Sequence, residues 1–592
     1  MLGWFVVLAG ALTWPMLRHP ATEALGSARG DGIKHLWTLW WMRASVWNEG
    51  QLPFHTTLIN WPVGMDLYPI EPLNGLFGVL APWMNVVLLS NLLIFGNLVA
   101  TGMAGAWFGR ELSGNDGGGF VAGTMLMGSS VMACFVHLGA AELTHIWWLP
   151  LGFGTLIRAR KGTSWMPFLA LSGCLVGATL SCFYLGMFLA MGTLVWSIST
   201  LWAGRRTPIL LVQYAVAAGL GLCVVVPVAT VFSGSYELGS VPDVSFMSYL
   251  SGEHGQPITD PTTARLELSQ LWTPGREAAN WQESAYGAGR YVGVVALLLA
   301  AWGLIRRPRQ GIPWLLVAAV GLVFAQGSYL TMGGEEVLVG GRKLQMPLVW
   351  LNRAMGYLAE PLNFPVRFQA LTVTALAGLA SLAVRGPWSL LGLLVVLEVS
   401  WGQMLDRPWE TLEPQEASAL RVVRDHEGHA MVDLALAWRS DAENRWSALS
   451  TQIEHEHPVQ AVPVERIEYF AMDGQHFVRA LPLLDDLEPL YNRSRGGLSG
   501  DYRSDLALLR DAGFHELLIN YRGGRETLPL PLVQAMDRLC GPALVRTGFL
   551  GLWPIPEVEY TEEEMTTWRE THQARVNQVM RLTPGMGPQV WQ

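Results

Sequence analysis

Long apolar segments recur through residues 1–404, and they restrict the possible folds of this chain more than any other feature. An α-helix needs about 20 apolar residues to cross a bilayer. Segments near this length lie at about 2–17, 90–109, 119–139, 143–157, 165–181, 183–202, 208–232, 291–305, 312–330, 368–384 and 388–404. Charged residues are only 15% of the chain, against about 25% in an average protein. The pattern predicts a polytopic α-helical membrane protein with about 11 transmembrane helices.

Residues 405–592 lack such segments and read as an ordinary soluble domain. Two segments of this region have the character of strands and two that of helices. The strands are expected at 430–436 and 516–520, and the helices at 501–512 and 560–582. The last helix begins with a capping signal, Thr561-Glu-Glu-Glu. We therefore expect a transmembrane domain (1–404) followed by a C-terminal soluble α/β domain (405–592).

Basic residues are concentrated in the loops on one side of the predicted bundle. They are Arg110, Arg158, Arg160, Lys161, Arg205, Arg206, Arg306, Arg307, Arg309 and Arg385. The positive-inside rule places such loops in the cytoplasm. The first outer loop (18–89), two large loops (233–290 and 331–366) and the C-terminal domain are then extracytoplasmic. This makes the chain a multi-pass protein of the plasma (inner) membrane, in contact with membrane lipids.

One stretch of the first outer loop, Glu71–Ser90, is apolar enough to be a further span. Pro82 and the polar residues Asn74 and Asn85 favour a re-entrant or interfacial segment instead. If this stretch did cross the membrane, the N-terminal loop would change sides.

Charge and cysteine content exclude two other classes. The net charge of −9 argues against nucleic acid as a partner, because nucleic-acid binding requires a basic surface. The five cysteines show no CxxC or other ligand spacing, so the sequence predicts neither a disulfide framework nor a zinc site.

The first outer loop carries a candidate catalytic acid, Asp31, just ahead of a tryptophan-rich helix. A helix over Ile33–Trp47 would align Trp37, Trp40, Trp41, Ala44 and Trp47 in one stripe. Such a stripe is typical of an amphipathic helix lying in the membrane interface. Asp31 is either the N-cap of this helix or a functional carboxylate, and the two roles are compatible.

Two further outer sites combine ionisable residues with an expected position at a span end. Glu142 and His145 lie in one short turn, where a carboxylate and an imidazole could position an acceptor, hold a metal or exchange a proton. Arg353 and Arg367 lie in and after the last large outer loop, and arginine binds phosphate bidentately. The alternatives are a solvated turn for the first pair, and pairing with lipid headgroups or Glu360 for the second.

Several short motifs resemble one membrane-enzyme family. They are Gly30-Asp31, Leu36–Trp41, Asn60-Trp-Pro62, Tyr68–Leu73, Ser181–Tyr184 and Phe364–Phe368. With these motifs the layout of about 400 residues resembles the GT-C superfamily of polytopic glycosyltransferases, including YfhO-like and GT-C-like bacterial membrane proteins.

The resemblance implies roles for two acids. An essential acidic residue in the first outer loop of GT-C enzymes matches Asp31, and a second acidic site that holds a metal in some members matches Glu142. A divalent metal, Mg²⁺ or Mn²⁺, held by Glu142 and Asp31, is then the one candidate cofactor. The sequence lacks a paired-acid motif at the second site, and it lacks a WWD-type motif, which disfavours oligosaccharyl transfer.

The expected function is a membrane glycosyltransferase. It would move a sugar from a polyprenyl-phosphate donor to a lipid, glycan or protein acceptor on the outer face, with Asp31 as general base. Glu142 and His145 would position the acceptor or a metal, and Arg353 and Arg367 would bind the donor phosphate. The alternatives are a lipid or glycan transporter or flippase, for which Glu398 is the main charge within a span, and a non-catalytic GT-C-like scaffold.

Overall fold

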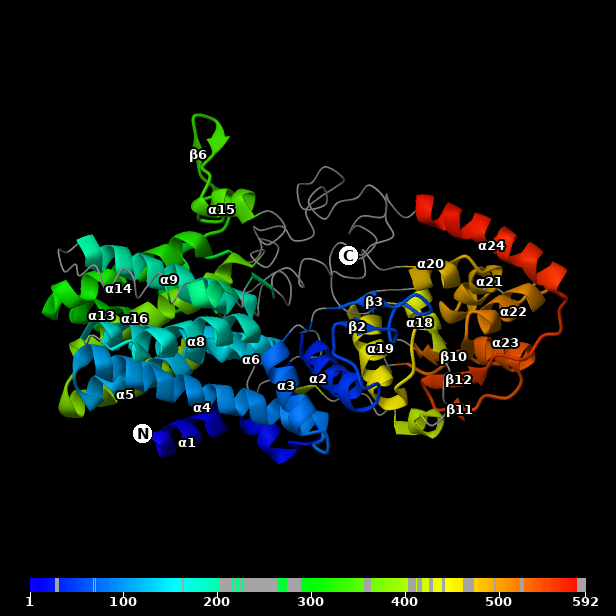
Figure 1. Cartoon of the computed structure of the whole chain (residues 1–592), viewed down its shortest axis with the longest axis horizontal. Coiled ribbons are helices and arrows are strands. Elements are labelled where there is room, and N and C mark those ends of the chain that lie inside the picture. Colours follow the sequence, from blue (N-terminus) through cyan, green and yellow to red (C-terminus); the bar gives the residue numbers. More distant parts are fainter. Residues whose placement is uncertain are drawn as a thin grey trace. The chain divides into compact units, whose positions relative to one another are not determined.

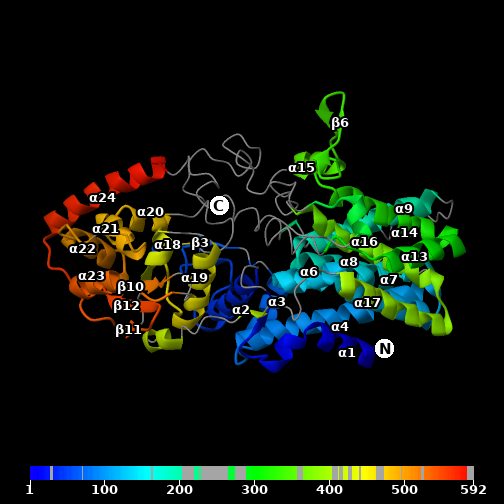
Figure 2. The ribbon, with the colours of Figure 1, turned by 180° about the vertical axis from the view of Figure 1, so that it is seen from behind.

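A computed structural model divides the chain into two compact units, which we describe separately (Figures 1 and 2). Unit 1 comprises residues 1–39, 70–230 and 259–412, and unit 2 comprises residues 40–69, 231–258 and 413–592. The structure describes residues 1–26, 31–67, 69, 71–161, 164–202, 216, 219–223, 226–227, 265–273, 289–355, 364–402, 411–412, 418–424, 430–438, 442–461, 473–494, 497–521 and 526–582. Most of the expected span at 208–232 and much of the loop at 233–290 lie outside these residues.

Unit 1 is a helical bundle. Its apolar helices are α1 (Leu2–Leu12), α4 (Val86–Ser113), α5 (Asp116–Met127), α6 (Ser130–Leu138), α7 (Trp148–Lys161), α8 (Met166–Ser181), α9 (Phe183–Trp202), α13 (Val294–Arg306), α14 (Pro308–Ala325), α16 (Gln369–Ala383) and α17 (Leu391–Gly402). In the described residues, five helical segments are long and apolar enough to cross a membrane: Val86–Ser113, Asp116–Leu138, Phe183–Thr200, Pro365–Ala383 and Pro308–Ala325. Four shorter apolar helices accompany them.

Two of these segments form the centre of the bundle. Within Pro365–Ala383 every residue of the apolar window is buried, and within Asp116–Leu138 the buried share is 94%. A helix that is apolar on all sides is stable when other helices surround it. Segments such as Val86–Ser113, buried over only 44% of the window, leave an apolar face for lipid.

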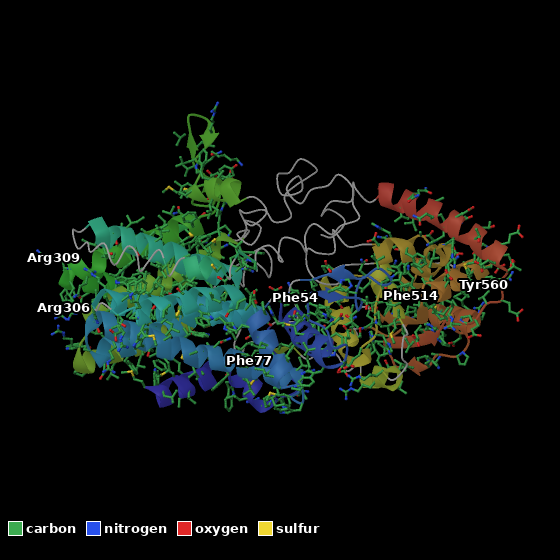
Figure 3. All side chains as sticks on the ribbon, viewed as in Figure 1. Phe54, Phe77, Arg306, Arg309, Phe514 and Tyr560 are labelled. Atoms are coloured by element: carbon green, nitrogen blue, oxygen red, sulfur yellow. The ribbon has the colours of Figure 1, made fainter. Side chains whose placement is uncertain are left out.

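Several of the predicted loop arginines that the structure describes gather at one end of this bundle. Arg306 donates a hydrogen bond to the Ala383 carbonyl oxygen (2.7 Å), and Arg307 donates to that of Ser113 (2.8 Å). The ends of α13, α16 and α4 therefore meet there. Figure 3 shows Arg306 and Arg309 at the end of unit 1 away from Phe77 of α3 (Pro72–Leu80).

Glu398, the carboxylate that the sequence places inside a span, caps a neighbouring helix. It accepts hydrogen bonds from the amides of Val294 (2.7 Å) and Val295 (2.8 Å) at the start of α13, and from the Tyr291 hydroxyl (2.9 Å). The first amides of a helix have no partner within the helix. Glu398 satisfies two of them, so its charge has a structural role.

The first outer loop folds differently from the interfacial helix that the sequence suggests. Its helix, α2 (Gly32–Trp47), has the expected range, but Lys34, His35 and Thr38 are as deeply buried as Trp37. The helix therefore does not present one apolar and one polar face. Trp47, at 61% exposure, is the tryptophan of α2 that reaches the surface.

The stretch 71–90 forms no separate span. Helix α3 has 9 residues and, at ~1.5 Å rise per residue, is much shorter than the ~30 Å hydrocarbon core. The next helix, α4, begins at Val86. The length of α3 is that of a non-spanning segment, and its re-entrant or interfacial position stays a prediction.

Unit 2 contains a four-stranded mixed sheet. Its strand order is β11 (Val545–Arg546), β12 (Leu550–Pro554), β10 (Phe514–Asn520), β9 (Ala430–Asp433), with β9 and β10 parallel. The four elements predicted for this region are present as β9, β10, α22 (Arg503–Asp511) and α24 (Glu562–Leu582). Reciprocal hydrogen bonds between Thr561 and Glu564 form the predicted capping box of α24.

Unit 2 also includes residues 40–69, which the sequence assigns to the membrane domain. The Trp61 indole donates to the Ala512 carbonyl oxygen (2.8 Å), and Asn60 accepts from the Gly474 amide (3.0 Å). The Val459 amide donates to the Leu58 carbonyl oxygen (2.9 Å). The Asn60-Trp-Pro62 motif is thus a docking element for the C-terminal residues.

A buried acid in unit 2 predicts that its stability depends on pH. Burial raises the pKa of Asp433 to about 7, although the Leu436 and Ala435 amides lower it in part. The carboxyl group therefore binds a proton in the folded chain between about pH 4 and 7, where the unfolded chain has released it. The contribution of Asp433 to the free energy of unfolding therefore falls by about 4 kcal/mol as the pH rises through that range.

Asp433→Asn keeps a side-chain oxygen for the Leu436 amide (3.2 Å) and removes the ionisation. We expect this variant to stabilise unit 2 at about pH 8 and to have little effect near pH 4. Maleimide labelling of the buried Cys540, followed by mass spectrometry in increasing urea, measures the opening of unit 2. The exposed Asp501→Asn is the control, and equal labelling of Asp433→Asn and the unmodified chain at high pH would contradict the prediction.

Candidate functional site

The candidate site is built around a contact between the start of α2 and the end of α6. The Asp31 amide donates to the Leu138 carbonyl oxygen (2.8 Å). Gly139 then ends α6 in a left-handed conformation (φ 69°), and a Cβ atom on it would lie 2.8 Å from the Gly32 Cα. A Cβ on Gly26 would lie 2.5 Å from the Gly139 Cα. Only glycine allows these backbones to approach so closely.

The first turn of α2 brings Asp31, Lys34 and His35 to one face, because residues three and four apart are neighbours on a helix. Lys34 Nζ lies 2.7 Å from Asp31 Oδ1. Burial alone would raise the pKa of Asp31, but the charges of Lys34, His35 and Arg367 outweigh it and lower that pKa below its ordinary value. The Asp31 side chain is still 23% exposed. It is therefore an ionised carboxylate that a bound molecule can reach.

His35 lies between two buried carboxylates. Its Nδ1 is 3.0 Å from Glu71 Oε1, and its Nε2 is 2.8 Å from Glu142 Oε2. Both ring nitrogens donate only when the imidazole is protonated. Burial opposes that charge, but Glu71 and Glu142 raise the pKa of His35 well above its ordinary value. In turn, His35 offsets the effect of burial on Glu142 and lowers its pKa.

A short 3₁₀ helix, η2 (Ala141–Trp147), positions Glu142 and His145. Side chains three residues apart eclipse in such a helix, so both point the same way. His145 Nε2 lies 2.8 Å from Asn74 Oδ1, and the Asn74 amide donates to Glu71 Oε2 (2.6 Å). Burial lowers the pKa of His145 to about 3. His145 is therefore neutral, and it holds Glu71 in place through Asn74.

Arg367 approaches the site from η5 (Pro365–Phe368), just before α16. Its guanidinium lies 4.6 Å from the centre of the Tyr184 ring and 4.4 Å from that of Phe364, and it donates a hydrogen bond to the Tyr184 hydroxyl. Its charge lowers the pKa of both Asp31 and Glu142. Arg367 is therefore within electrostatic reach of both acids.

The structure brings together Asp31, Glu142, His145 and Arg367 of the predicted site residues. Arg353 falls in α15 (Pro347–Met355), and its side chain lies outside the described residues. Sequence reasoning noted Glu71 as a further acid of the first outer loop without assigning it to the site, and it missed His35. The spacing of His35 from Asp31, four residues on a predicted helix, was the signal that could have pointed to it.

His35, Glu71 and Glu142 form the group in the described residues that could hold a metal ion. One ligand atom of each lies within 4.8 Å of the others. Two carboxylates and one neutral imidazole suit a divalent ion such as Mn²⁺, so an ion bound here would have to displace the proton that His35 holds between Glu71 and Glu142. Asp31 is not part of this group, because it pairs with Lys34, and the metal pair of Glu142 and Asp31 stays a prediction.

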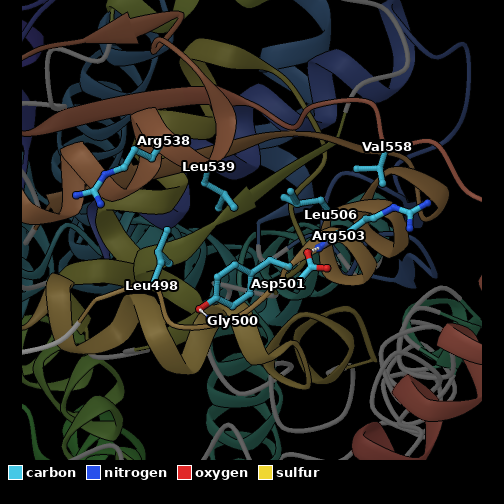
Figure 4. Close-up of a pocket in the computed structure, with 9 residues that line it drawn as sticks. Leu498, Gly500, Asp501, Arg503, Leu506, Arg538, Leu539 and Val558 are labelled. Carbon is cyan, nitrogen blue, oxygen red and sulfur yellow. Dashed lines mark hydrogen bonds between the residues drawn. The ribbon is translucent and has the colours of Figure 1, made fainter.

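A separate cavity of about 450 Å³ lies in unit 2 (Figure 4). Apolar side chains such as Leu506 and Leu539 line it, and Arg503 and Arg538 stand at opposite ends. Arg503 already contacts Glu564 (3.2 Å). No sequence motif pointed to this cavity.

Comparison with models of protein families and with curated protein sequences gives no match. Three solved structures illustrate the likeness found in space. They are the arabinofuranosyltransferase AftD from Mycobacteria (TM-score 0.52, 11% identity, 94% of this chain and 40% of that chain), the oligosaccharyltransferase AglB from Archaeoglobus fulgidus (0.45, 11%, 87% and 69%) and ArnT from Cupriavidus metallidurans (0.42, 12%, 94% and 99%).

Of these three, AftD carries the argument, because its TM-score exceeds 0.5. At this identity the likeness concerns the fold alone, and this chain spans 40% of the length of AftD. The chain therefore has a fold like that of the matched part of AftD, which is the kind of fold that the sequence resemblance implies. Together with the apolar helices of unit 1, this makes it an integral membrane protein.

The glycine contact gives a prediction with a matched control. Gly139→Ala and Gly114→Ala both place a side chain in a left-handed conformation (φ 69° and 76°), which costs about 1 kcal/mol. A Cβ on Gly114 meets nothing within 4 Å, whereas one on Gly139 must push α2 away from α6. We expect Gly139→Ala to lower the Tm in detergent well below that of Gly114→Ala. Equal Tm values would show that the contact tolerates a methyl group.

Proposed function

We propose that the chain is a membrane glycosyltransferase that moves a sugar from a polyprenyl-phosphate donor to an acceptor hydroxyl at the extracytoplasmic surface. The observation that carries the proposal is Asp31, an ionised and partly exposed carboxylate within electrostatic reach of the buried Arg367, in a GT-C-like fold. A general base and a phosphate-stabilising cation are the two groups this reaction needs.

Asp31 would act on the acceptor. The acceptor oxygen attacks the anomeric carbon, the bond from that carbon to the phosphate oxygen breaks, and Asp31 takes the hydroxyl proton. Polyprenyl phosphate leaves with the electron pair of the broken bond. Lys34, 2.7 Å from Asp31, fixes the carboxylate and keeps it ionised until the proton arrives.

Arg367 would stabilise the leaving phosphate. Negative charge grows on the phosphate oxygen as the sugar departs, and a preorganised cation lowers the energy of that transition state. Tyr184 and Phe364 hold the guanidinium from both sides. Arg353 remains a proposed second phosphate ligand.

Glu142 and His145 would shape the acceptor side, with His145 acting through Asn74 and Glu71. The acceptor is a lipid, a glycan or a protein. Transport is the weaker alternative, because Glu398, which a transporter would use within the membrane, caps α13.

A divalent metal fits the buried group His35, Glu71 and Glu142 once His35 has lost its proton, because a protonated imidazole has no lone pair for a metal. When bound there, it would supply a positive charge within the site. The residues' own contribution is to hold three ligand atoms within 4.8 Å and to exclude water, since all three are buried. We propose these residues as the site in place of Asp31 with Glu142.

Asp31→Asn tests the proposed base. Loss of a general base reduces reaction rates by about 10²–10⁴-fold. We therefore expect the rate of sugar transfer to fall by about 10²-fold or more, while the donor still binds. The assay follows radiolabelled sugar from a panel of synthetic polyprenyl-phosphate pentoses and hexoses in nanodiscs. Asp66→Asn is the control, because Asp66 is half-exposed and pairs with His55 (2.7 Å).

Two results would overturn this proposal. Full transfer by Asp31→Asn would remove Asp31 from the mechanism. Donor binding without transfer from any member of the panel would instead support a non-catalytic scaffold.

Glu71→Gln and Glu142→Gln test the metal group. We expect each to weaken Mn²⁺ binding by 10-fold or more, on the order of the loss seen when metal-site carboxylates are altered, because a neutral amide is a poorer ligand. Electron paramagnetic resonance of free Mn²⁺ measures the binding directly. Glu49→Gln, at an exposed position of the same loop, is the control, and Mn²⁺ binding that survives both substitutions would locate the ion elsewhere.

A further inference from the structure

A small β-structure interrupts the chain between α14 and η5. It contains two antiparallel hairpins, β4 (Thr331–Met332) with β5 (Glu335–Glu336), and β6 (Leu338–Val339) with β7 (Arg342–Lys343). We call residues 338–343 the arm. The first strand, β4, begins five residues after Gln326, which follows the last residue of α14, and the last strand, β7, is followed by α15 (Pro347–Met355).

The tip of the arm exposes aliphatic side chains. Leu338 is 62% and Val339 60% exposed. Gly340 and Gly341, at φ 60° and 77°, form the turn between them and β7. Two successive positive φ values are the geometry of a tight hairpin turn. The two glycines therefore form the turn that places the apolar side chains at the tip of the arm.

The base of the arm is held firmly. Three backbone hydrogen bonds join the chain segments there. The Leu330 amide donates to the Leu344 carbonyl oxygen (3.0 Å), the Val337 amide to that of Leu330 (2.9 Å), and the Leu344 amide to that of Val337 (2.9 Å). Lys343 Nζ lies 2.6 Å from Glu336 and 5.3 Å from the centre of the Tyr329 ring. The hairpin of β4 and β5 is anchored as well, because the Gly334 amide in its turn donates a hydrogen bond to the Glu267 carboxylate (2.8 Å). The exposed tip is therefore a fixed projection.

The direction of the arm relates it to the bilayer. In Figures 1 and 2 the hairpin labelled β6 projects from unit 1 across the direction of the long helices α14 and α16. Those helices are long and apolar enough to cross a membrane. A projection across them, leaving from their ends near Arg367, runs along the membrane surface.

We propose that the arm lies in the headgroup layer of the bilayer and inserts Leu338 and Val339 toward the acyl chains. Exposed Arg342 beside this tip suits anionic lipid phosphates. Trp350 of α15, 61% exposed near the base of the arm, is of the residue type that favours this layer. The proposal depends on unit 1 spanning the membrane and not on the catalytic function.

Site-directed spin labelling tests this assignment in the full chain. The background is Cys223→Ser, because Cys223 is exposed and the other four cysteines are buried. Leu338→Cys places a label at the tip, and Glu335→Cys places the control label on the exposed strand of the anchored hairpin. Collisions with oxygen, which partitions into lipid, and with a water-soluble nickel chelate are measured in phosphatidylcholine–phosphatidylglycerol nanodiscs.

We expect the oxygen-to-nickel accessibility ratio at position 338 to exceed that at 335 several-fold. Arg342→Glu should reduce the ratio at 338 when phosphatidylglycerol is present and leave it unchanged in phosphatidylcholine alone. High accessibility to both reagents at 338 would mean that the tip is in water. Low accessibility to both would mean that protein covers it, for example a second copy of the chain, and either result would overturn the proposal.

Discussion

The backbone contact among Gly26, Gly32 and Gly139 fixes the geometry on which the candidate site depends. It allows the Asp31 amide to reach the Leu138 carbonyl oxygen, and so joins the first turn of α2 to the end of α6. Glu142 follows Gly139 by three residues, and His35 follows Asp31 by four, so a single contact sets the position of both. A shift of about 1 Å would break the contact between His35 and Glu142, whose nearest side-chain atoms are now 2.8 Å apart.

Such close packing removes water from several charges, and the arrangement of the site compensates for this loss. An isolated buried ion costs several kcal/mol or more, yet Glu71 and Glu142 share the His35 cation, while Lys34 faces Asp31. The compensation is unequal, because Asp31 keeps 23% exposure and Glu71 none. Glu71 and Glu142 thus share a positive charge in a buried position, whereas Asp31 is the most exposed of the three acids.

Local signals in the sequence identified much of this arrangement. The apolar spans, the helix after Asp31 and the strands at Ala430 and Phe514 followed from periodicity, and Asp31, Glu142 and Arg367 from their places at expected span ends. His35 and Glu71 could not be found in this way, because they meet only when α2 and α3 pack together. The tryptophans of α2 misled for a related reason: an apolar stripe does not reveal whether lipid or protein will cover it. Trp61 likewise binds Ala512, some 450 residues away in the chain.

The distribution of charge along the bundle bears on what the molecule does. Arg306 and Arg307 close one end through Ala383 and Ser113, while Arg367 lies at the opposite end of α16, near Asp31 and Glu142. The one carboxylate noted within a span, Glu398, is taken up by the amides of α13. Under the proposed function, Asp31, Glu142 and Arg367 would act at the level of the lipid phosphates and not at the bilayer midplane, where a transporter binds its cargo. The proposed lipid-linked donor, whose reactive carbon is attached to a headgroup phosphate, would reach them without leaving its leaflet.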